Sequence, residues 1–371
     1  MRLLFFGTYD ASAHPRVAVL RDGLREHGND VAECNVPLGL STADRVGMLR
    51  NPAGLPRLAW RIARCWAGLV RRARRYRREG AWPDAVVVGY LGHFDVLLAR
   101  RLFPHVPVVL DHLIGASDTA TDRGVSDGLR QRLLRRLDAA ALGAADLVVV
   151  DTEEHRDALP TQVRGRTVVV AVGAPREWYA PESAAPRTDG PLRAVFFGLF
   201  TPLQGAPTIG AALDLLADDP VEVTMVGSGQ DHDETLRLAA RNRRVRWLDW
   251  VGPAQLPALV AEHDVCLGIF GTAPKAARVV PNKVFQGAAA GCALVTADTP
   301  PQRRVLGDAA LLVPPGDAES LAETLRLLAK DRERLAAARD AAARLAHEQF
   351  TPARVVQPLH DRLLTVVPPE V

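Results

Sequence analysis

The chain has 371 residues, of which 48% are hydrophobic and 24% charged, and its formal net charge at pH 7 is +3. This is the composition of a soluble globular protein. The absence of low-complexity tracts, of repeats and of apolar runs near the roughly 18 residues of a spanning helix excludes repeat and transmembrane architectures. The length exceeds one ordinary hydrophobic core, so two domains are expected.

The N-terminus and the cysteines indicate a cytoplasmic protein. The first residues form a strand pattern and lack the apolar region of a signal peptide. The four cysteines are far apart, and each stands in an apolar run, as buried thiols do in a reducing compartment. We therefore expect neither disulfides nor a cysteine metal site.

The first half of the chain alternates strand and helix patterns. Runs rich in Val, Leu and Phe predict strands at 2–6, 30–35, 85–89, 107–110, 146–150 and 167–172. Helical patterns between them include 15–27, 56–79, 94–103 and 125–142. Unbroken apolar strands separated by helices are typical of right-handed βαβ units in a doubly wound parallel sheet.

One helix in this half is strongly basic. Residues 57–78 hold nine arginines and no acidic residue. An apolar stripe at helical spacing is expected to pack on the sheet, which turns the arginines outward; it consists of Leu58, Ile62, Trp66, Leu69, Ala73 and Tyr76. The basic face is either a solvated surface or a contact with anionic lipid at the inner face of the membrane. Nucleic acid ranks last, because no aromatic residues punctuate the basic face and no binding motif is present.

A segment rich in Pro, Gly and Ala at 173–191 is interpreted as a linker, after which the alternation restarts. Strands are predicted at 194–198, 221–226, 245–249, 264–269, 292–296 and 310–313. Helices are predicted at 206–217, 230–241, 255–262, 282–290, 317–328, 331–348 and 352–364. The expected architecture is α/β, with Rossmann-like domains at 1–175 and 176–350 facing each other across a cleft. A terminal helical segment, 351–371, is expected to pack back on the first domain.

Four loops that leave strands of the second domain are expected to line this cleft, because ligands bind at the carboxyl ends of parallel strands. They span 196–208, 225–235, 247–257 and 269–283. The first contains Gln204 and Gly205. In the second, Gly227 either lets a ligand approach the backbone or makes a plain tight turn. In the third, Trp250 is placed to face a flat ring.

The fourth loop leads into a helix that begins near Asn282 and delivers three cations, Lys275, Arg278 and Lys283. A helix start with cations beside it is an anion site, so a phosphate or diphosphate ligand is expected. Gln286 lies one turn beyond Asn282 and is expected on the same side of the helix. The alternative is a solvated helix end with an incidental lysine.

The chain resembles family 4 of the glycosyltransferases, retaining GT-B enzymes that use nucleotide sugars. The matching stretches of the second half are "VFFGLFTPLQG", "TMVGSG", "LPALVAEHDVCLGIFG", "PNKVFQGAAAGCALVTADTP" and "ALLVPPGDAESLAETLRLL". Those of the first half are "HPRVAVLRDGLREHGNDV", "PVVLDHLIGASDT" and "AADLVVVDTEEH". The resemblance covers nearly the whole chain.

The resemblance implies a hexosyltransferase-type enzyme with a UDP- or GDP-linked donor on the second domain and an acceptor on the first. The acceptor is a small molecule, a glycan or a lipid-linked molecule, and neither a metal nor another cofactor is expected. Catalytic roles are assigned to Asp111, His112, Lys275 and Lys283. Donor-binding roles are assigned to Gly7, Thr8, Arg16, Gln204, Gly205, Gly227, Trp250, Arg278, Asn282 and Gln286. For His112 and the nearby His93, an ordinary loop histidine is the alternative.

The sequence also departs from the family pattern. Arg278 and Gln286 stand where the family usually carries two glutamates, and Gln204 stands where a lysine is usual. We interpret this as a rearranged site, in which the cations have moved to the fourth loop and Gln286 offers an amide to the ribose. The alternatives are a decayed site, a GT-B sugar-nucleotide epimerase, and a non-catalytic partner that binds a nucleotide sugar.

Overall fold

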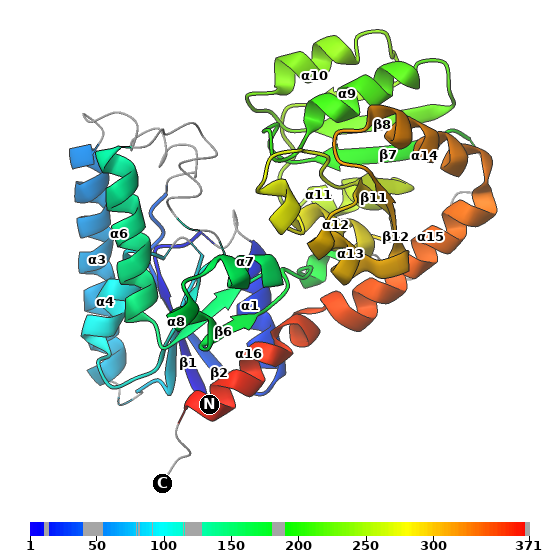
Figure 1. Ribbon diagram of the computed structural model, residues 1–371. Coiled ribbons are helices and arrows are strands. Elements are labelled where there is room, and N and C mark those ends of the chain that lie inside the picture. Colours follow the sequence, from blue (N-terminus) through cyan, green and yellow to red (C-terminus); the bar gives the residue numbers. More distant parts are fainter. Residues whose placement is uncertain are drawn as a thin grey trace. The chain divides into compact units, whose positions relative to one another are not determined.

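The computed structural model describes residues 1–10, 15–39, 55–78, 80, 82–90, 92–113, 115, 128–179 and 190–367. They form two compact units (Figure 1). The first comprises Met1–Ala171 with Val355–Val371, and the second Val172–Arg354. The first unit thus ends at Ala171, where sequence reasoning placed the boundary after residue 175. The chain returns to that unit at Val355, where residue 351 was expected.

The first unit is built on a six-stranded parallel sheet with the order β2-β1-β3-β4-β5-β6. The strands are β1 (Arg2–Gly7), β2 (Asp30–Asn35), β3 (Ala85–Val88), β4 (Val108–Asp111), β5 (Leu147–Val150) and β6 (Thr167–Val169). The helices are α1 (Pro15–Glu26), α3 (Leu55–Arg78), α4 (Asp95–Leu102), α6 (Leu129–Ala144), α7 (Glu153–Ala158), α8 (Thr161–Arg164) and α16 (Pro352–Val366). All six predicted strands are present, and Ala85–Val88 are fully buried, as expected for strands covered on both faces.

Helices cover both faces of this sheet. Leu4 and Phe6 of β1 point into a core that includes residues of α3, α4 and α6. Figure 1 shows these three helices side by side. Leu3 and Phe5 point to the other face, into a core with α1 and α16. The terminal helix therefore belongs to the first unit, although the residues before it belong to the second.

Helix α3 has the two faces that the sequence predicted. Its side chains Leu58, Leu69 and Ala73 are buried, and eight of its nine arginines are classed as exposed. Trp60 is 61% exposed, with the Arg64 guanidinium 5.6 Å from its ring centroid. The prediction that no aromatic side chain stands on the basic face is therefore wrong, because Trp60 lies on the exposed side among the arginines.

The second unit holds a six-stranded parallel sheet with the order β12-β11-β10-β7-β8-β9. The strands are β7 (Leu192–Phe197), β8 (Val221–Val226), β9 (Val245–Leu248), β10 (Val265–Leu267), β11 (Ala293–Ala297) and β12 (Ala310–Val313). The helices are α9 (Ala206–Leu215), α10 (His232–Leu238), α11 (Leu256–Ala261), α12 (Asn282–Ala289), α13 (Pro300–Leu306), α14 (Ala318–Lys330) and α15 (Arg332–Leu345). Shorter turns are η2 (Arg176–Trp178), η3 (Ala276–Arg278), η4 (Gly307–Ala309) and η5 (Ala346–Phe350). Its main core lies between the sheet and α9, α14 and the start of α15.

The predicted linker is partly structured. Turn η2 lies within it, and Trp178 is 5% exposed, stacked on Phe197 with ring centroids 5.5 Å apart. This aromatic anchor attaches the start of the segment to the second unit. Residues 180–189 of the predicted linker and residues 125–127 of the predicted helix lie outside the described residues.

Candidate active site

Glycines bring three loops of the second unit into backbone contact at the carboxyl ends of its strands. A Cβ added at Gly227 would lie 2.0 Å from the carbonyl oxygen of Gly198. At Gly205, which has a φ of +66°, an added Cβ would lie 2.3 Å from the Gly271 nitrogen. These contacts leave no room for a side chain, so Gly205 and Gly227 let neighbouring loops approach one another.

Lys283 is a charged residue whose side chain is almost completely buried among these loops. It lies on the first turn of α12 and is 4% exposed. Its Nζ donates a hydrogen bond to Gln204 Oε1 at 2.5 Å and lies 3.6 Å from the ring centroid of Phe196. A Cβ added at Gly198 would lie 3.3 Å from this Nζ, so the glycine leaves space for the ammonium.

No described carboxylate forms an ion pair with Lys283. Burial lowers the pKa of its ammonium to about 7, because the charged form loses hydration. An amide oxygen and an aromatic face compensate only part of that cost. The arrangement therefore favours an anion beside Lys283, where the N-terminal turn of α12 adds free backbone N–H groups.

The other predicted polar residues of α12 differ in exposure. Gln286 is 7% exposed, and its side chain makes no hydrogen bond to a described residue. Asn282 is exposed at the helix start. Gln286 follows Lys283 by three residues, so both side chains lie on one side of the helix. The structure thus brings Gln204 and Lys283 into contact and places Gln286 three residues further along the same helix.

The remaining predicted residues of this unit are placed less clearly for ligand binding. Lys275 is buried beside η3, and Arg278 is half-buried at its end; both already have partners in the structure. Trp250 follows β9 and is 76% exposed, so its indole is accessible to a flat ring. That Lys275, Arg278 and Lys283 converge on one ligand remains a prediction. Of the three, Lys283 has the geometry that supports it.

In the first unit, Arg16 and Asp111 form a buried ion pair. Arg16 Nε donates to both carboxylate oxygens, at 2.9 Å and 3.1 Å. Its Nη1 donates to the carbonyl oxygens of Val170 and Ala171, at 3.0 Å and 3.2 Å. Burial raises the pKa of Asp111, and the Arg16 charge opposes that shift. The pair ties the start of α1 to the end of β4 and to the chain after β6, which is a structural use of both residues.

Gly7 and Thr8 contact a carboxylate that sequence reasoning missed. The backbone nitrogen and Oγ1 of Thr8 donate to Asp95 Oδ2 at 2.7 Å and 2.8 Å. Trp66 Nε1 donates to Asp95 Oδ1 at 3.0 Å. A Cβ added at Gly7 would lie 3.1 Å from Asp95 Oδ2. The available signal was an acidic residue in the first turn of a helix, next to the loop after β3.

His112 lies in a buried polar layer at the carboxyl edge of the first sheet. Its ring centroid is 5.2 Å from that of His93, at an interplanar angle of 72°. His93 Nε2 in turn lies 3.4 Å from Asp138 Oδ1 on α6. Burial, followed by the His93 charge, lowers the pKa of His112 to about 4, so His112 is neutral at pH 7. The adjacent pair of His155 and Asp151 was not foreseen, because it joins a strand end to the unpredicted helix α7.

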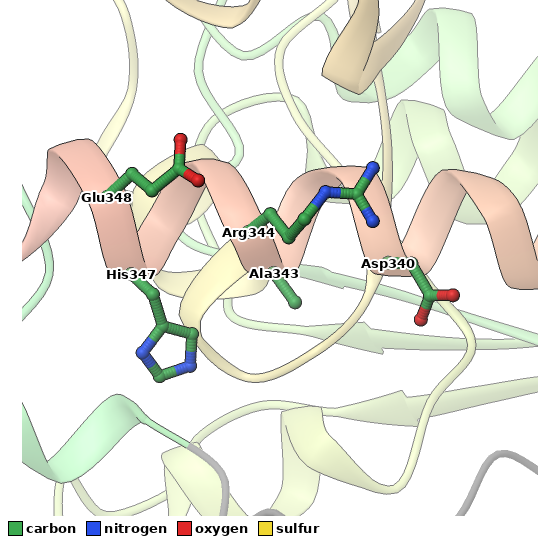
Figure 2. A pocket seen from close by; sticks show the side chains of 5 residues that line it. All are labelled: Asp340, Ala343, Arg344, His347 and Glu348. Carbon is green, nitrogen blue, oxygen red and sulfur yellow. The ribbon is translucent and has the colours of Figure 1, made fainter.

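A hollow of about 340 Å³ lies apart from these residues. Figure 2 shows that its five side chains come from one continuous helical stretch of α15 and η5. His347 and Asp340 point to one side of that helix, while Arg344 and Glu348 lie on the other. A hollow walled by a single helix encloses little of a ligand, and it contains none of the predicted site residues.

The described residues contain no group of three or more His, Cys, Asp or Glu side chains arranged to hold a metal ion. No described helix has the length and apolar character that crossing a bilayer requires.

Residues 191–331 match the family model described as Glycosyl transferases group 1. This segment is therefore similar to the group 1 glycosyltransferases. The match covers β7 through α14 and includes Gln204, Lys283 and Gln286. The match supports, for this segment, the glycosyltransferase activity expected from the sequence. No curated protein sequence matches the chain.

Solved structures support the fold. HepE from Anabaena, in complex with UDP and glucose, shares 17% identity at a TM-score of 0.66, covering 98% of this chain and 100% of its own. Sucrose-phosphate synthase from Thermosynechococcus elongatus shares 16% identity at a TM-score of 0.71, covering 98% and 99%. The E. coli trehalose-6-phosphate structure bound with UDP-2-fluoro glucose shares 14% identity at a TM-score of 0.66, covering 100% of each chain. The predicted GT-B fold, with two Rossmann-like units, is confirmed.

Proposed function

We propose that this protein transfers a sugar from a UDP- or GDP-linked donor to an acceptor, with retention of anomeric configuration. The observation that carries the proposal is Lys283, a buried cation at a helix start with no described carboxylate partner, inside the segment that is similar to the group 1 glycosyltransferases. The likeness to HepE, which was solved in complex with UDP and glucose, supports a nucleotide sugar as the donor.

Lys283 is proposed to stabilise the leaving nucleoside diphosphate. When the bond between the sugar and the diphosphate breaks, negative charge grows on the diphosphate oxygens. A cation already fixed by Gln204 and Phe196 meets that charge without reorganising. The N–H groups at the start of α12 contribute in the same direction. The reaction by this route uses no metal or other cofactor.

Gln286 is proposed to bind the ribose of the donor. Its buried amide has both a donor and an acceptor group, and neither is used by a described residue. Trp250 supplies an exposed aromatic face for the base, and Asn282 an amide beside the diphosphate. The acceptor is assigned to the first unit. The neutral imidazole of His112 is proposed to contact the transferred sugar. Asp111 is proposed to hold the end of β4, just before His112, in place through its ion pair with Arg16.

Donor turnover tests this function against its alternatives. UDP- and GDP-linked sugars are incubated with the protein, with and without a deproteinised extract as the source of acceptors. A transferase releases nucleoside diphosphate mainly when the extract is present. An epimerase changes the donor without extract, and a non-catalytic binding protein leaves it intact in both. If no donor is consumed in the presence of extract, the proposed transfer is wrong.

We also propose that α3 binds anionic lipid at the cytoplasmic face of a membrane. Its exposed stripe of arginines includes Trp60, a side chain suited to the boundary between lipid and water. Each arginine near such a surface contributes about 1 kcal/mol, and the attraction weakens in salt. Flotation with anionic vesicles, but not neutral ones, is expected at low salt and is lost when Arg71, Arg74 and Arg75 become glutamate. Equal recovery with both vesicle types would contradict it.

A further inference from the structure

A groove of about 490 Å³ lies over the outer strands of the second sheet. Glu222, Thr224 and Arg246 alternate along β8 and β9 with the apolar residues that pack into the core, so they project from the opposite face of the sheet. Arg193 of β7 and the residues just before β9 complete the lining. The groove is at the amino ends of the strands, away from Lys283 and the loops of the candidate active site.

Three arginines of this groove have no charged partner among the described residues. They are Arg243, Arg244 and Arg246, which are all exposed. Some other arginines of the same unit are paired: Arg241 Nε lies 3.1 Å from Asp214 Oδ1, and Nε of the half-buried Arg326 lies 2.8 Å from Asp219 Oδ2. The exposed Arg334, Arg344 and Arg354 also lack an ion pair among the described residues, but they are spread along α15 and α16, whereas three such guanidinium groups line this one groove.

The charges of the groove are mixed. Glu222 Oε2 lies 3.8 Å from Arg193 Nε, and Glu262 also lines the groove. His263 Nδ1 donates to the Leu259 carbonyl oxygen at 2.8 Å, and its Nε2 lies 2.9 Å from Thr224 Oγ1. Burial lowers the pKa of His263 from its ordinary value, so its imidazole adds little charge at pH 7. Four arginines against two glutamates leave the groove positive, but carboxylates stand between the cations.

We propose that this groove binds an extended acidic segment of a partner protein. Arg244 and Arg246 are two residues apart at the start of β9, so their side chains leave the same face at a spacing of about 7 Å. An extended peptide presents alternate side chains at the same spacing, and carboxylates at every second position would meet both guanidiniums. The proposal does not depend on glycosyl transfer.

The glutamates favour a polypeptide over a phosphate-rich partner. A nucleic acid or an anionic membrane presents negative charge at every position, and Glu222 and Glu262 repel it. Helix α3 shows the contrasting case, a basic face without a single acid. Strand β9 also ends the sheet order, so within the described part of the chain its outer backbone edge pairs with no other strand. A peptide can add to such an edge through main-chain hydrogen bonds.

Fluorescence anisotropy with a labelled peptide of repeated Glu-Thr pairs tests the proposal at low salt. The full-length protein is compared with the double variant Arg244→Glu and Arg246→Glu, and with the charge-matched control Arg237→Glu and Arg334→Glu, whose residues are exposed outside the groove. Affinity is expected to fall about tenfold or more in the groove variant and less than about twofold in the control. The double alanine variant, which introduces no repulsion, is expected to lose affinity in the same direction.

Three results of these binding measurements would each overturn the proposal. No binding of the peptide to the wild-type protein overturns the proposal, as does an equal loss in the groove variant and the control. Tighter groove-dependent binding of single-stranded DNA or of anionic vesicles than of the peptide also overturns it, since the partner would then be a phosphate surface. Thermal melts of all variants establish that each one is folded.

Discussion

Lys283 combines a cost to the folded protein with a proposed benefit to the reaction. The ammonium is buried against Phe196 and Gln204, and no described carboxylate neutralises it. A buried cation of this kind is expensive in the absence of an anion. Its position at the start of α12 is where a diphosphate binds most favourably. The two facts together explain why a lysine stands on a helix that is otherwise largely buried.

The first prediction concerns the pH dependence of donor binding. In the proposed function the charged form of Lys283 binds the diphosphate, and in the free protein burial lowers the pKa of this ammonium to about 7. Affinity for a UDP- or GDP-linked sugar, whose diphosphate does not titrate in this range, should fall about tenfold from about pH 6 to about pH 9. Calorimetry on the Lys283→Met variant should show weak binding without this slope. A flat profile in the wild-type protein would exclude Lys283 as the diphosphate ligand.

The second prediction concerns stability without a ligand. The unfolded chain keeps the Lys283 proton up to its ordinary pKa of 10.5, whereas the folded protein releases it near 7. The unfolded state therefore binds more protons between these values, and the free energy of unfolding rises with pH across that window. Lys283→Met should be more stable than the wild type by about 1 to 2 kcal/mol at about pH 6, as is common for functional residues. Urea denaturation measures this, and a variant that is less stable at that pH would contradict it.

The third prediction concerns Gln286, which stands where the resembled family has a glutamate. Gln286→Ala should raise the Michaelis constant with little change in turnover, because a ribose contact exists before and during the reaction. Gln286→Glu should weaken donor binding, since a carboxylate one turn from Lys283 would pair with the ammonium in place of the diphosphate. Steady-state kinetics with both variants measure the Michaelis constant and the turnover number. Improved activity of Gln286→Glu would mean that glutamine is only a weaker substitute.

At the scale of elements, α12 is held against the sheet by small residues. A Cβ added at Gly287 would lie 2.5 Å from both Cβ and Sγ of Cys266 on β10. This close approach sets the distance between the helix and the sheet, and it thereby sets the positions of Lys283 and Gln286. The four small residues that follow Gln286 in the sequence allow α12 to pack closely on the sheet. The three polar residues of the helix, Asn282, Lys283 and Gln286, are explained by the proposed donor site.

The fourth prediction tests that packing. Gly287→Ala should destabilise the protein by about 1 to 3 kcal/mol and weaken nucleotide binding, because α12 must move away from β10. Gly143→Ala on α6 is the matched control. An added Cβ there meets no atom within 4 Å, so the change should be neutral or stabilising by up to about 1 kcal/mol. Equal effects of the two substitutions on the denaturation midpoint would contradict the close packing of α12.

At the scale of the whole molecule, the sheets were predictable and the side-chain partnerships were not. Every predicted strand is present, because buried parallel strands leave unbroken apolar runs. The short helices α7, α8 and α13 were missed, since one or two turns carry too little periodicity. Asp95 and the ion pair between Arg16 and Asp111 join residues far apart in the chain, which spacing alone does not relate. In the candidate site, Lys283 and Gln286 were found because a helix start fixes their relation locally.

A thermal-shift titration with UDP, GDP, uridine and guanosine tests the central claim that the second unit binds a nucleoside diphosphate at Lys283. A ligand at 100 times its dissociation constant stabilises a protein by about 2.7 kcal/mol. UDP or GDP should therefore raise the melting temperature by several degrees, the nucleosides should not, and Lys283→Met should lose most of the shift. If neither diphosphate shifts the melting temperature at millimolar concentration, or if Lys283→Met responds as the wild type does, the account of this site is wrong.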